Sequence, residues 1–287
     1  MAVATLHAAP RPRAYVSVIG PDAAAYLNRM VSNEVESLPV GGSCEALLLT
    51  PKARIIAPLV VCRRGEDDFL LVTEPVAGER LARELVRARF AAKCSIEPEE
   101  HRSLLVLGAD EHVSSQHELA FPNRDYGVQA VEVLDADPPE GSEPISDDEL
   151  ERLRILARTP RLGAELDDRV MPAEAGLEER AISFTKGCYP GQEPVARLHH
   201  RGHPNRGLRV LALSGDGLPA YDAELTLEGK VVGRVTSAAP RPADGVVALA
   251  YVRREVPPEA DLLVDGRVAR QLGDSGDPAT LTGSPRP

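Results

Sequence analysis

The 287-residue chain has no tryptophan, only 3% aromatic residues and four widely spaced cysteines. With so few aromatic residues, the walls of any ligand pocket are predicted to be aliphatic. Cysteines this far apart form neither a disulfide framework nor a C-x-x-C metal knuckle, so we expect reduced thiols in a cytoplasmic protein. The four cysteines are Cys44, Cys62, Cys94 and Cys188.

Long apolar runs are also absent, so no segment is expected to span a bilayer and no membrane partner is predicted. Residues 1–13 have no leading charge followed by an apolar stretch, which argues against a secretory signal. The net charge of −11 would repel DNA and anionic lipid. No direct nucleic-acid contact is therefore expected, and the only local basic candidate is the segment Arg197 to Arg209. The sequence also contains no internal repeat and no glycine-rich phosphate loop.

Apolar periodicity in the first half predicts strands and helices in mixed order, which indicates an α+β fold. A helix is expected around residues 23–30 and another over 74–90. Ser146 and Glu149 form a capping-box pattern that opens a third helix through Arg158. The predicted strands are Tyr15–Ile19, Ala46–Leu49, Ile55–Val61, Phe69–Thr73, Leu104–Leu107 and Val128–Leu134.

The second half is organised differently, with short strands separated by Gly, Pro or Asp turns. Five such strands predict a small antiparallel barrel or sandwich. The acidic, proline-rich interval 135–148 is interpreted as a solvated linker. We expect an N-terminal lobe over 8–134, a second part over 146–204, a barrel over 205–273 and a disordered tail over 274–287. The five strands are Leu208–Leu213, Glu224–Leu227, Lys230–Thr236, Val246–Val252 and Asp261–Val264.

The most informative segment is Lys-Gly-Cys-Tyr-Pro-Gly-Gln-Glu at residues 186–193. Glycine can adopt φ > 0 and proline fixes φ at about −65°, so a sharp turn is predicted around Cys188. Cations at Lys186 and Arg197 would favour its thiolate. We therefore favour a reactive or ligand-contacting Cys188. The alternative is a small buried residue in a tight turn.

An H-H-x-x-H pattern follows at His199, His200 and His203. Together with Cys188 these side chains are candidate metal ligands, but a nearby glycine and proline are expected to break any helix there. A solvated cationic loop without a metal site is the preferred interpretation. Four arginines either bind an anion such as a carboxylate tail or form a solvated basic edge. They are Arg197, Arg201, Arg206 and Arg209.

Glu174 follows a proline in an apolar setting, where a carboxylate is costly to bury without donors. A ligand presenting two parallel N–H groups would satisfy it, with each charge-assisted bond contributing about 1.5–3 kcal/mol. The alternative is an acid at a helix N-terminus, stabilised by the helix dipole. The sequence leaves these two interpretations open.

Residues 186–193 resemble the hallmark of the YgfZ family of folate-binding proteins, a branch of the group that contains the glycine-cleavage T protein, an aminomethyltransferase. Shorter motifs support this resemblance across most of the chain. They are Gly20-Pro-Asp22 with Leu27 and Asn33, Thr50-Pro51-Lys52, Arg161-Leu162-Gly163 before Glu165, Pro172-x-Glu174 and Ser183-Phe184-x-Lys186.

The resemblance implies a ring-like α+β fold with a central folate pocket and a C-terminal barrel. It also implies binding of tetrahydrofolate or a derivative, and a role in assembly or repair of iron–sulfur clusters, including those of tRNA-modifying enzymes. The expected partners are folate and iron–sulfur enzymes or assembly factors. Cys188 and Lys186 are the predicted catalytic residues of the turn, and Glu174 is predicted to hold the pterin. Phe184 and Tyr189 are the nearest rings. Further predicted folate contacts are Tyr189, Gln192, Glu193, Arg197 and Arg124, the last with a surface role as the alternative.

The sequence also departs from the aminomethyltransferases, which carry an aspartate in an Ile-Leu-Asp-Asp-type strand. The corresponding strand here has Ala57 and Pro58, and Glu74-Pro75 replaces an Asn-Ala pair. Loss of such an acid removes a contribution of about 10²–10⁴-fold to proton transfer. Glycine-cleavage activity is therefore not expected. A folate-dependent aminomethyltransferase or demethylase is the alternative function, and an interaction module that has lost folate is a third.

Overall fold

The computed structural model describes residues 5–109, 117–241 and 245–273, and the predicted disordered tail lies outside these ranges. The chain forms two compact units, which are described separately. The first unit comprises Met1–Asn123, Ala130–Pro144 and Leu166–His203. The second unit comprises Arg124–Gln129, Ile145–Glu165 and Pro204–Pro287.

The first unit contains two five-stranded sheets. One of them is antiparallel throughout and is rich in Val, Leu and Ile, which suit a pleated surface buried on at least one face. Its strand order is β3 (Ser43–Leu49), β4 (Ile55–Arg63), β5 (Asp68–Thr73), β2 (Ala14–Ile19) and β6 (Ser95–Glu99).

The second sheet of this unit carries a buried charge on one of its inner strands. Glu132 is fully buried and accepts two bonds of 2.7 Å from Arg13, together with bonds from Ser103 and Asn123. Burial alone would raise the pKa of Glu132, but Arg13 and these donors hold it below its usual range. The strand order is β10 (Glu143–Pro144), β1 (His7–Pro10), β7 (Ser103–Leu107), β9 (Ala130–Leu134) and β8 (Ala120–Pro122).

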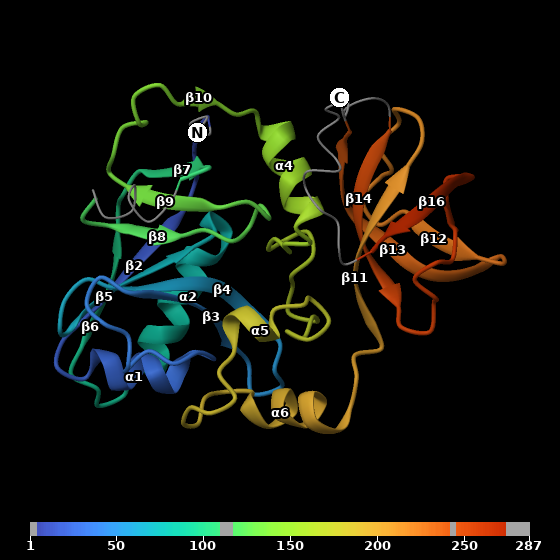
Figure 1. Ribbon diagram of the computed structural model, residues 1–287. Helices are drawn as coiled ribbons and strands as arrows, with labels where there is room; N and C mark the ends of the chain where they lie inside the picture. The colour runs from blue at the N-terminus through green and yellow to red at the C-terminus, as the bar shows by residue number, and fades with distance from the viewer. Residues whose placement is uncertain (1–4, 110–116, 242–244, 274–287) are drawn as a thin grey trace. The chain divides into compact units, whose positions relative to one another are not determined.

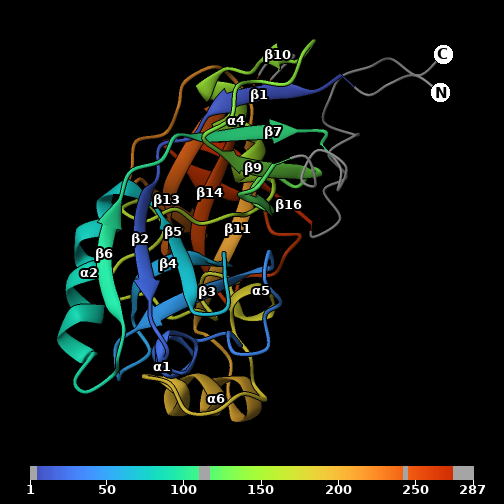
Figure 2. The same ribbon diagram turned by 90° about the vertical axis from the view of Figure 1, so that its left-hand side faces the viewer.

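In the described ranges of the first unit there are four helices, which Figure 1 shows. Helix α2 packs on β2 so closely that a Cβ on Gly78 would lie 2.4 Å from the Ala14 side chain. Figure 2 shows α2 lying along β2 and β6. Pro75 occupies the start of α2, where its missing N–H has no helical partner to lose. The helices are α1 (Ala23–Met30), α2 (Pro75–Ala88), α5 (Glu178–Ala181) and α6 (Gln192–Arg201).

The second unit contains helix α4 (Asp147–Leu156) and a closed barrel of antiparallel strands. The Ser146 hydroxyl accepts the Glu149 N–H at 3.2 Å, which confirms the serine cap of the predicted helix, while the Glu149 carboxylate pairs with Arg152. The barrel has six strands where the sequence predicted five. Their order is β11 (Arg206–Leu213), β14 (Val246–Arg253), β13 (Lys230–Pro240), β12 (Glu224–Leu227), β15 (Leu262–Val264) and β16 (Arg267–Leu272).

A buried ion pair joins α4 to the barrel. Arg154 donates to Glu165 at 3.0 Å, and both side chains are almost completely buried. Ser237 of β13 donates to the same carboxylate at 2.6 Å, and the Tyr251 hydroxyl of β14 donates to the Glu165 carbonyl at 3.0 Å. The Arg-Leu-Gly motif before Glu165 therefore lies at a structural junction, because the Arg161 N–H also donates to this carboxylate.

The predicted α+β class and the C-terminal antiparallel barrel are both confirmed. The interval interpreted as a solvated linker was partly wrong, since Glu143–Pro144 forms β10 and pairs in parallel with β1. Within the described ranges, no helix is long and apolar enough to cross a membrane.

Candidate functional site

The turn around Cys188 is held from one side by Gly191. Gly191 has φ +84°, a conformation that L side chains rarely adopt, and it immediately precedes helix α6. A Cβ at this position would lie 2.6 Å from the Thr50 carbonyl oxygen and 3.0 Å from the Ala53 Cα. Only glycine therefore allows the turn to press against the β3–β4 connection. Cys188 itself is exposed, which excludes the buried-packing interpretation.

Lys186 holds the same turn from the other side. Its ammonium donates to the carbonyl oxygens of Asn28, Val31 and Asn33 at 2.6, 2.8 and 2.6 Å. These carbonyls lie at the C-terminal end of α1, where helix carbonyls lack intrahelical partners and a cation is favoured. Burial lowers the pKa of Lys186 to about 8, although the nearby Glu34 carboxylate opposes the shift. In this structure Lys186 joins the turn to α1 and has its three N–H groups engaged.

Tyr189 is the third anchored residue of the turn. Its ring is buried, and the Lys186 ammonium lies 5.6 Å from the ring centroid. Within the described residues, the Tyr189 hydroxyl is buried without a hydrogen-bond partner. Burial, together with the nearby Glu178 carboxylate, raises the pKa of Tyr189 to about 12. The turn thus has fixed residues on both sides of an exposed thiol.

Helix α6 follows the turn and carries the next predicted contacts. Gln192 is half-buried at its first position, whereas Glu193 and Arg197 are exposed. The predicted loop was wrong for His199 and His200, because α6 continues to Arg201. Gly202 ends the helix rather than preventing it. The His199 ring stacks on Phe184 with centroids 3.9 Å apart, and it lies 3.7 Å from the Glu178 carboxylate.

Glu174 lies in a separate turn between Val170 and α5. Its carboxylate accepts the Met171 N–H at 3.0 Å, and the Met171 carbonyl accepts the Glu174 N–H at the same distance. Helix α5 begins only at Glu178, so Glu174 is not in the first turn of a helix. The helix-dipole alternative is therefore excluded. The half-buried carboxylate is instead oriented by its own turn.

The segment that contains Cys188 and the segment that leads into the Glu174 turn both contact the β3–β4 connection of the first unit. Gly191 presses on it from one segment. From the other, the Ile55 N–H donates to the Val170 carbonyl at 3.3 Å, and Arg54 donates to the Arg169 carbonyl at 2.6 Å. Ala53, with φ +56° and no exposed surface, occupies a left-handed position that glycine usually takes. In the sequence this hairpin was noted only as a motif match. Its contacts with both segments were not predicted.

Several of the other predicted residues belong to the second unit. Arg124 is exposed and belongs to the second unit. The four arginines proposed as an anion site are divided between the units. Arg209 donates to the Val256 carbonyl at 2.8 Å, and the Arg206 guanidinium lies 4.5 Å from the Tyr251 ring centroid. Both are engaged within the barrel unit.

Strand β4 supplies no acid at the position where the aminomethyltransferases carry one. Ala57 is fully buried, and Pro58 pairs with Leu47 in the sheet. Glu74 directly precedes α2 and Pro75 begins it. Across the described part of the chain, no three His, Cys, Asp or Glu side chains are grouped as metal ligands. The chemistry that this arrangement supports is presentation of an exposed thiol on a fixed turn.

Comparisons with known proteins agree with this combination of fold and turn. Residues 13–108 match the family model described as the GCVT N-terminal domain. The chain is 28% identical over 295 residues to the tRNA-modifying protein YgfZ of Edwardsiella ictaluri, covering 90% of this chain and 87% of that protein. It is 27% identical over 311 residues to the mitochondrial iron-sulfur cluster assembly factor IBA57 homolog of Pyricularia oryzae, covering 95% of this chain and 77% of that protein.

Two further similarities extend this comparison. A putative chloroplastic transferase of Arabidopsis thaliana is 26% identical over 278 residues, and the match covers 84% of this chain but only 63% of that protein. The crystal structure of glycine cleavage system aminomethyltransferase T from Bartonella henselae superposes with a TM-score of 0.81 at 20% identity, covering 95% of this chain and 86% of that one. This likeness establishes the fold.

The fold and the turn together define a protein of the aminomethyltransferase T architecture with a cysteine-bearing turn. Residues 13–108 match the GCVT N-terminal domain, and the resemblance of the chain to the YgfZ and aminomethyltransferase T proteins is confirmed.

Proposed function

We propose that this protein binds tetrahydrofolate or a derivative and supports the assembly or repair of iron–sulfur clusters, including those of tRNA-modifying enzymes in the cytoplasm. The printed functions of two relatives, a tRNA-modifying protein and an iron-sulfur cluster assembly factor, support this proposal. The observation that carries it is the exposed Cys188, held between the buried Lys186 and the sterically required Gly191.

The thiol is proposed to act on a cluster or on a cluster-carrying partner. Thiolates are the usual protein ligands of iron–sulfur clusters, and an exposed cysteine on a fixed turn can reach a bulky partner. Lys186 and Tyr189 are proposed to position the turn, because their contacts lie inside the unit. Cys188 is then the member of the motif that contacts the substrate.

The donor and acceptor chemistry near Glu174 fits a reduced pterin. Its half-buried carboxylate would accept two parallel N–H groups from the amino-pyrimidine edge, and its turn already fixes its orientation. Among the described residues the buried Tyr189 hydroxyl has no hydrogen-bond partner, and it is a further polar atom within the motif. Gln192, Glu193 and Arg197 are further proposed contacts from α6, and bound tetrahydrofolate would supply a one-carbon carrier. Arg124 is retained as a proposed contact from the second unit.

Titration calorimetry with tetrahydrofolate tests the pterin assignment. Glu174→Ala is expected to weaken binding by about one to a few kcal/mol, the range for donors left without an acceptor. Glu179→Ala is the matched control, since Glu179 is an exposed acid in the same segment. Equal affinity of wild type and Glu174→Ala would place the pterin elsewhere. No binding at millimolar ligand would favour a module that has lost folate.

Complementation tests the thiol. In a strain that lacks its own homologue, Cys188→Ala is expected to fold and bind folate normally but to leave iron–sulfur enzyme activities low. Cys44→Ala is the control, because Cys44 is half-buried and outside the turn. Full rescue by Cys188→Ala would show that the thiol has no role.

The second candidate function is a folate-dependent aminomethyltransferase or demethylase, which the fold of the Bartonella enzyme favours. Ala57 and Pro58 oppose it, since neither side chain can transfer a proton. Transfer of a one-carbon unit from an amine to tetrahydrofolate by the purified protein would support this second function and overturn the first.

A further inference from the structure

The outward face of helix α2 combines exposed apolar and cationic side chains. Val76, Arg83 and Arg87 recur at helical spacing along one stripe of α2, and Phe90 follows two residues after the end of the helix. Phe90 is 93% exposed and Val76 is 72% exposed. A fully exposed phenylalanine is costly to leave in water, and this chain has only four phenylalanines and no tryptophan. Such a face is typical of a contact surface.

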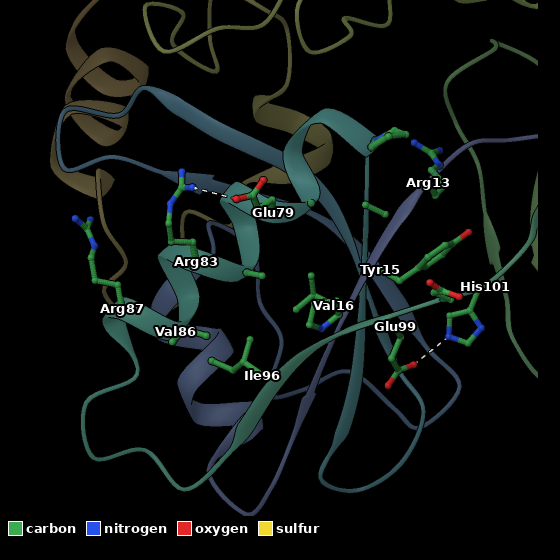
Figure 3. Close-up of a pocket in the computed structure, with 16 residues that line it drawn as sticks. Arg13, Tyr15, Val16, Glu79, Arg83, Val86, Arg87, Ile96, Glu99 and His101 are labelled. Carbon is green, nitrogen blue, oxygen red and sulfur yellow. Dashed lines mark hydrogen bonds and ion pairs between the residues drawn. The ribbon is translucent and has the colours of Figure 1, made fainter.

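A groove runs beside this stripe, between α2 and the edge strand β6 (Figure 3). It has a cavity volume of about 1050 Å³, which is enough to receive several side chains. Val16, Ile96 and Ala82 provide apolar lining, and Val86 lies at its margin with 48% of its surface exposed. Arg83 and Arg87 line the same groove from α2, one helical turn apart. The whole feature lies in the first unit.

The α2 side of the groove has a charge opposite to that of the protein, whereas the β6 side carries Glu100 and Glu99, the latter paired with Arg64 and His101. Residues 79–93 contain five cationic and two acidic side chains, whereas the whole chain has a net charge of −11. Arg83 lies 3.8 Å from Glu79 and Arg87 lies 2.6 Å from Glu84, with both arginines largely exposed. Exposed pairs of this kind contribute little because water screens them. Both guanidinium groups can therefore exchange these partners for other carboxylates.

We propose that this α2 face and its groove dock an acidic amphipathic helix of another protein. Apolar side chains of that helix enter the groove beside Val86, and its carboxylates pair with Arg83 and Arg87. Phe90 packs against the end of the docked helix. A second copy of this chain is disfavoured, because two cationic faces would repel each other. Nucleic acid is disfavoured because it has no apolar side chain to fill the groove.

The proposal is tested with a fluorescein-labelled 18-residue peptide helix that carries leucines at i, i+3, i+4 and i+7 and glutamates on both flanks. Fluorescence anisotropy with the full chain is expected to show salt-sensitive binding. R83E/R87E is expected to weaken it about tenfold or more, because attraction becomes repulsion. The same peptide with lysines in place of glutamates is expected to bind R83E/R87E better than wild type. Phe90→Ala is expected to weaken binding without changing its salt dependence.

The matched control is R253E/R270E in the barrel. These two arginines are 62% and 78% exposed, against 61% and 78% for Arg83 and Arg87, and the change in net charge is the same. Equal weakening in both double variants would overturn the proposal, since only net charge would matter. Absence of peptide binding would also overturn it. Tighter binding of a labelled single-stranded oligonucleotide would assign the face to nucleic acid. Loss of a dimer in R83E/R87E, seen by sedimentation, would assign it to self-association.

Discussion

Replacing Lys186 by methionine tests whether this residue stabilises the cysteine-bearing turn. Methionine has a similar volume but cannot donate hydrogen bonds, so the carbonyls of Asn28, Val31 and Asn33 lose their shared donor. Each buried acceptor left unpaired costs about 1–3 kcal/mol, which gives roughly 3–9 kcal/mol for the three.

A second contribution has the opposite sign. The variant no longer buries a charged group, and burial lowers the pKa of Lys186 from its ordinary 10.5 to about 8. At about 1.4 kcal/mol for each pKa unit, removing that charge returns about 3.5 kcal/mol. We therefore expect Lys186→Met to lower the free energy of unfolding by about 2.5 kcal/mol, which is the middle of the carbonyl range, about 6 kcal/mol, less this gain.

Urea unfolding followed by far-ultraviolet circular dichroism measures this difference without requiring tryptophan fluorescence. Lys52→Met is the matched control, because Lys52 is exposed in the same unit and is expected to change stability by less than about 0.5 kcal/mol. If the two variants had equal midpoints, the three carbonyl bonds would contribute no more than the cost of burying the Lys186 charge. Lys186 would then be available for chemistry at the turn.

Three further predictions concern the same unit. Gly191→Ala is expected to destabilise the protein by about 3 kcal/mol in urea unfolding, because it adds a steric contact to a left-handed backbone. Gly141 has φ +78° and open space around it, so Gly141→Ala is expected to cost only about 1 kcal/mol in the same measurement. The Arg64 guanidinium holds the pKa of Glu99 at about 2. Above about pH 4.5 the urea midpoint of the wild type is therefore expected to exceed that of Glu99→Gln, and this difference is expected to disappear as the pH falls toward 2. Iodoacetamide at pH 8 is expected to alkylate Cys188 first, because Cys62 and Cys94 are buried and burial raises the pKa of the half-buried Cys44 to about 12.

Each of these predictions has a contradicting outcome. Equal loss of stability in the two glycine variants would mean that contact with the Thr50 carbonyl is relieved by a small movement. A constant gap between wild type and Glu99→Gln down to pH 2 would show that the carboxylate does not titrate with folding. Mass spectrometry showing alkylation of Cys44 before Cys188 would mean that the turn is closed in solution.

Strands with a clear apolar pattern were predicted from the sequence. Strands that form because neighbouring strands offer a free edge were not predicted. Phe69–Thr73 is predicted on its own residues and forms most of β5. Strand β16 has a single buried residue, Ala269, among arginines and glutamine, so its sequence carries no apolar alternation. It exists because both β11 and β15 offer free edges that it pairs with. Strand β6 was missed for a similar reason, since Ile96 is its one buried residue.

Local turn chemistry was also readable from the sequence, within limits. Gly191 and Pro190 predict a sharp turn at Cys188, and the structure has one. The role of Gly202 was misread, because a glycine that ends a helix and one that prevents it look alike without the packing that stabilises the preceding turns. The helix that includes His199 and His200 could not be predicted without knowing that His199 stacks on Phe184.

The α+β class, the C-terminal barrel and a cysteine in a tight turn could all be predicted from the sequence, because hydrophobic period and glycine conformation are local properties. Which side chains of the motif face inward could be seen only in the folded chain. Lys186 lies next to Gly187 in sequence, yet its ammonium is held by carbonyls more than 150 residues away. Contacts at such separation depend on the whole chain's packing, so no local pattern could assign them.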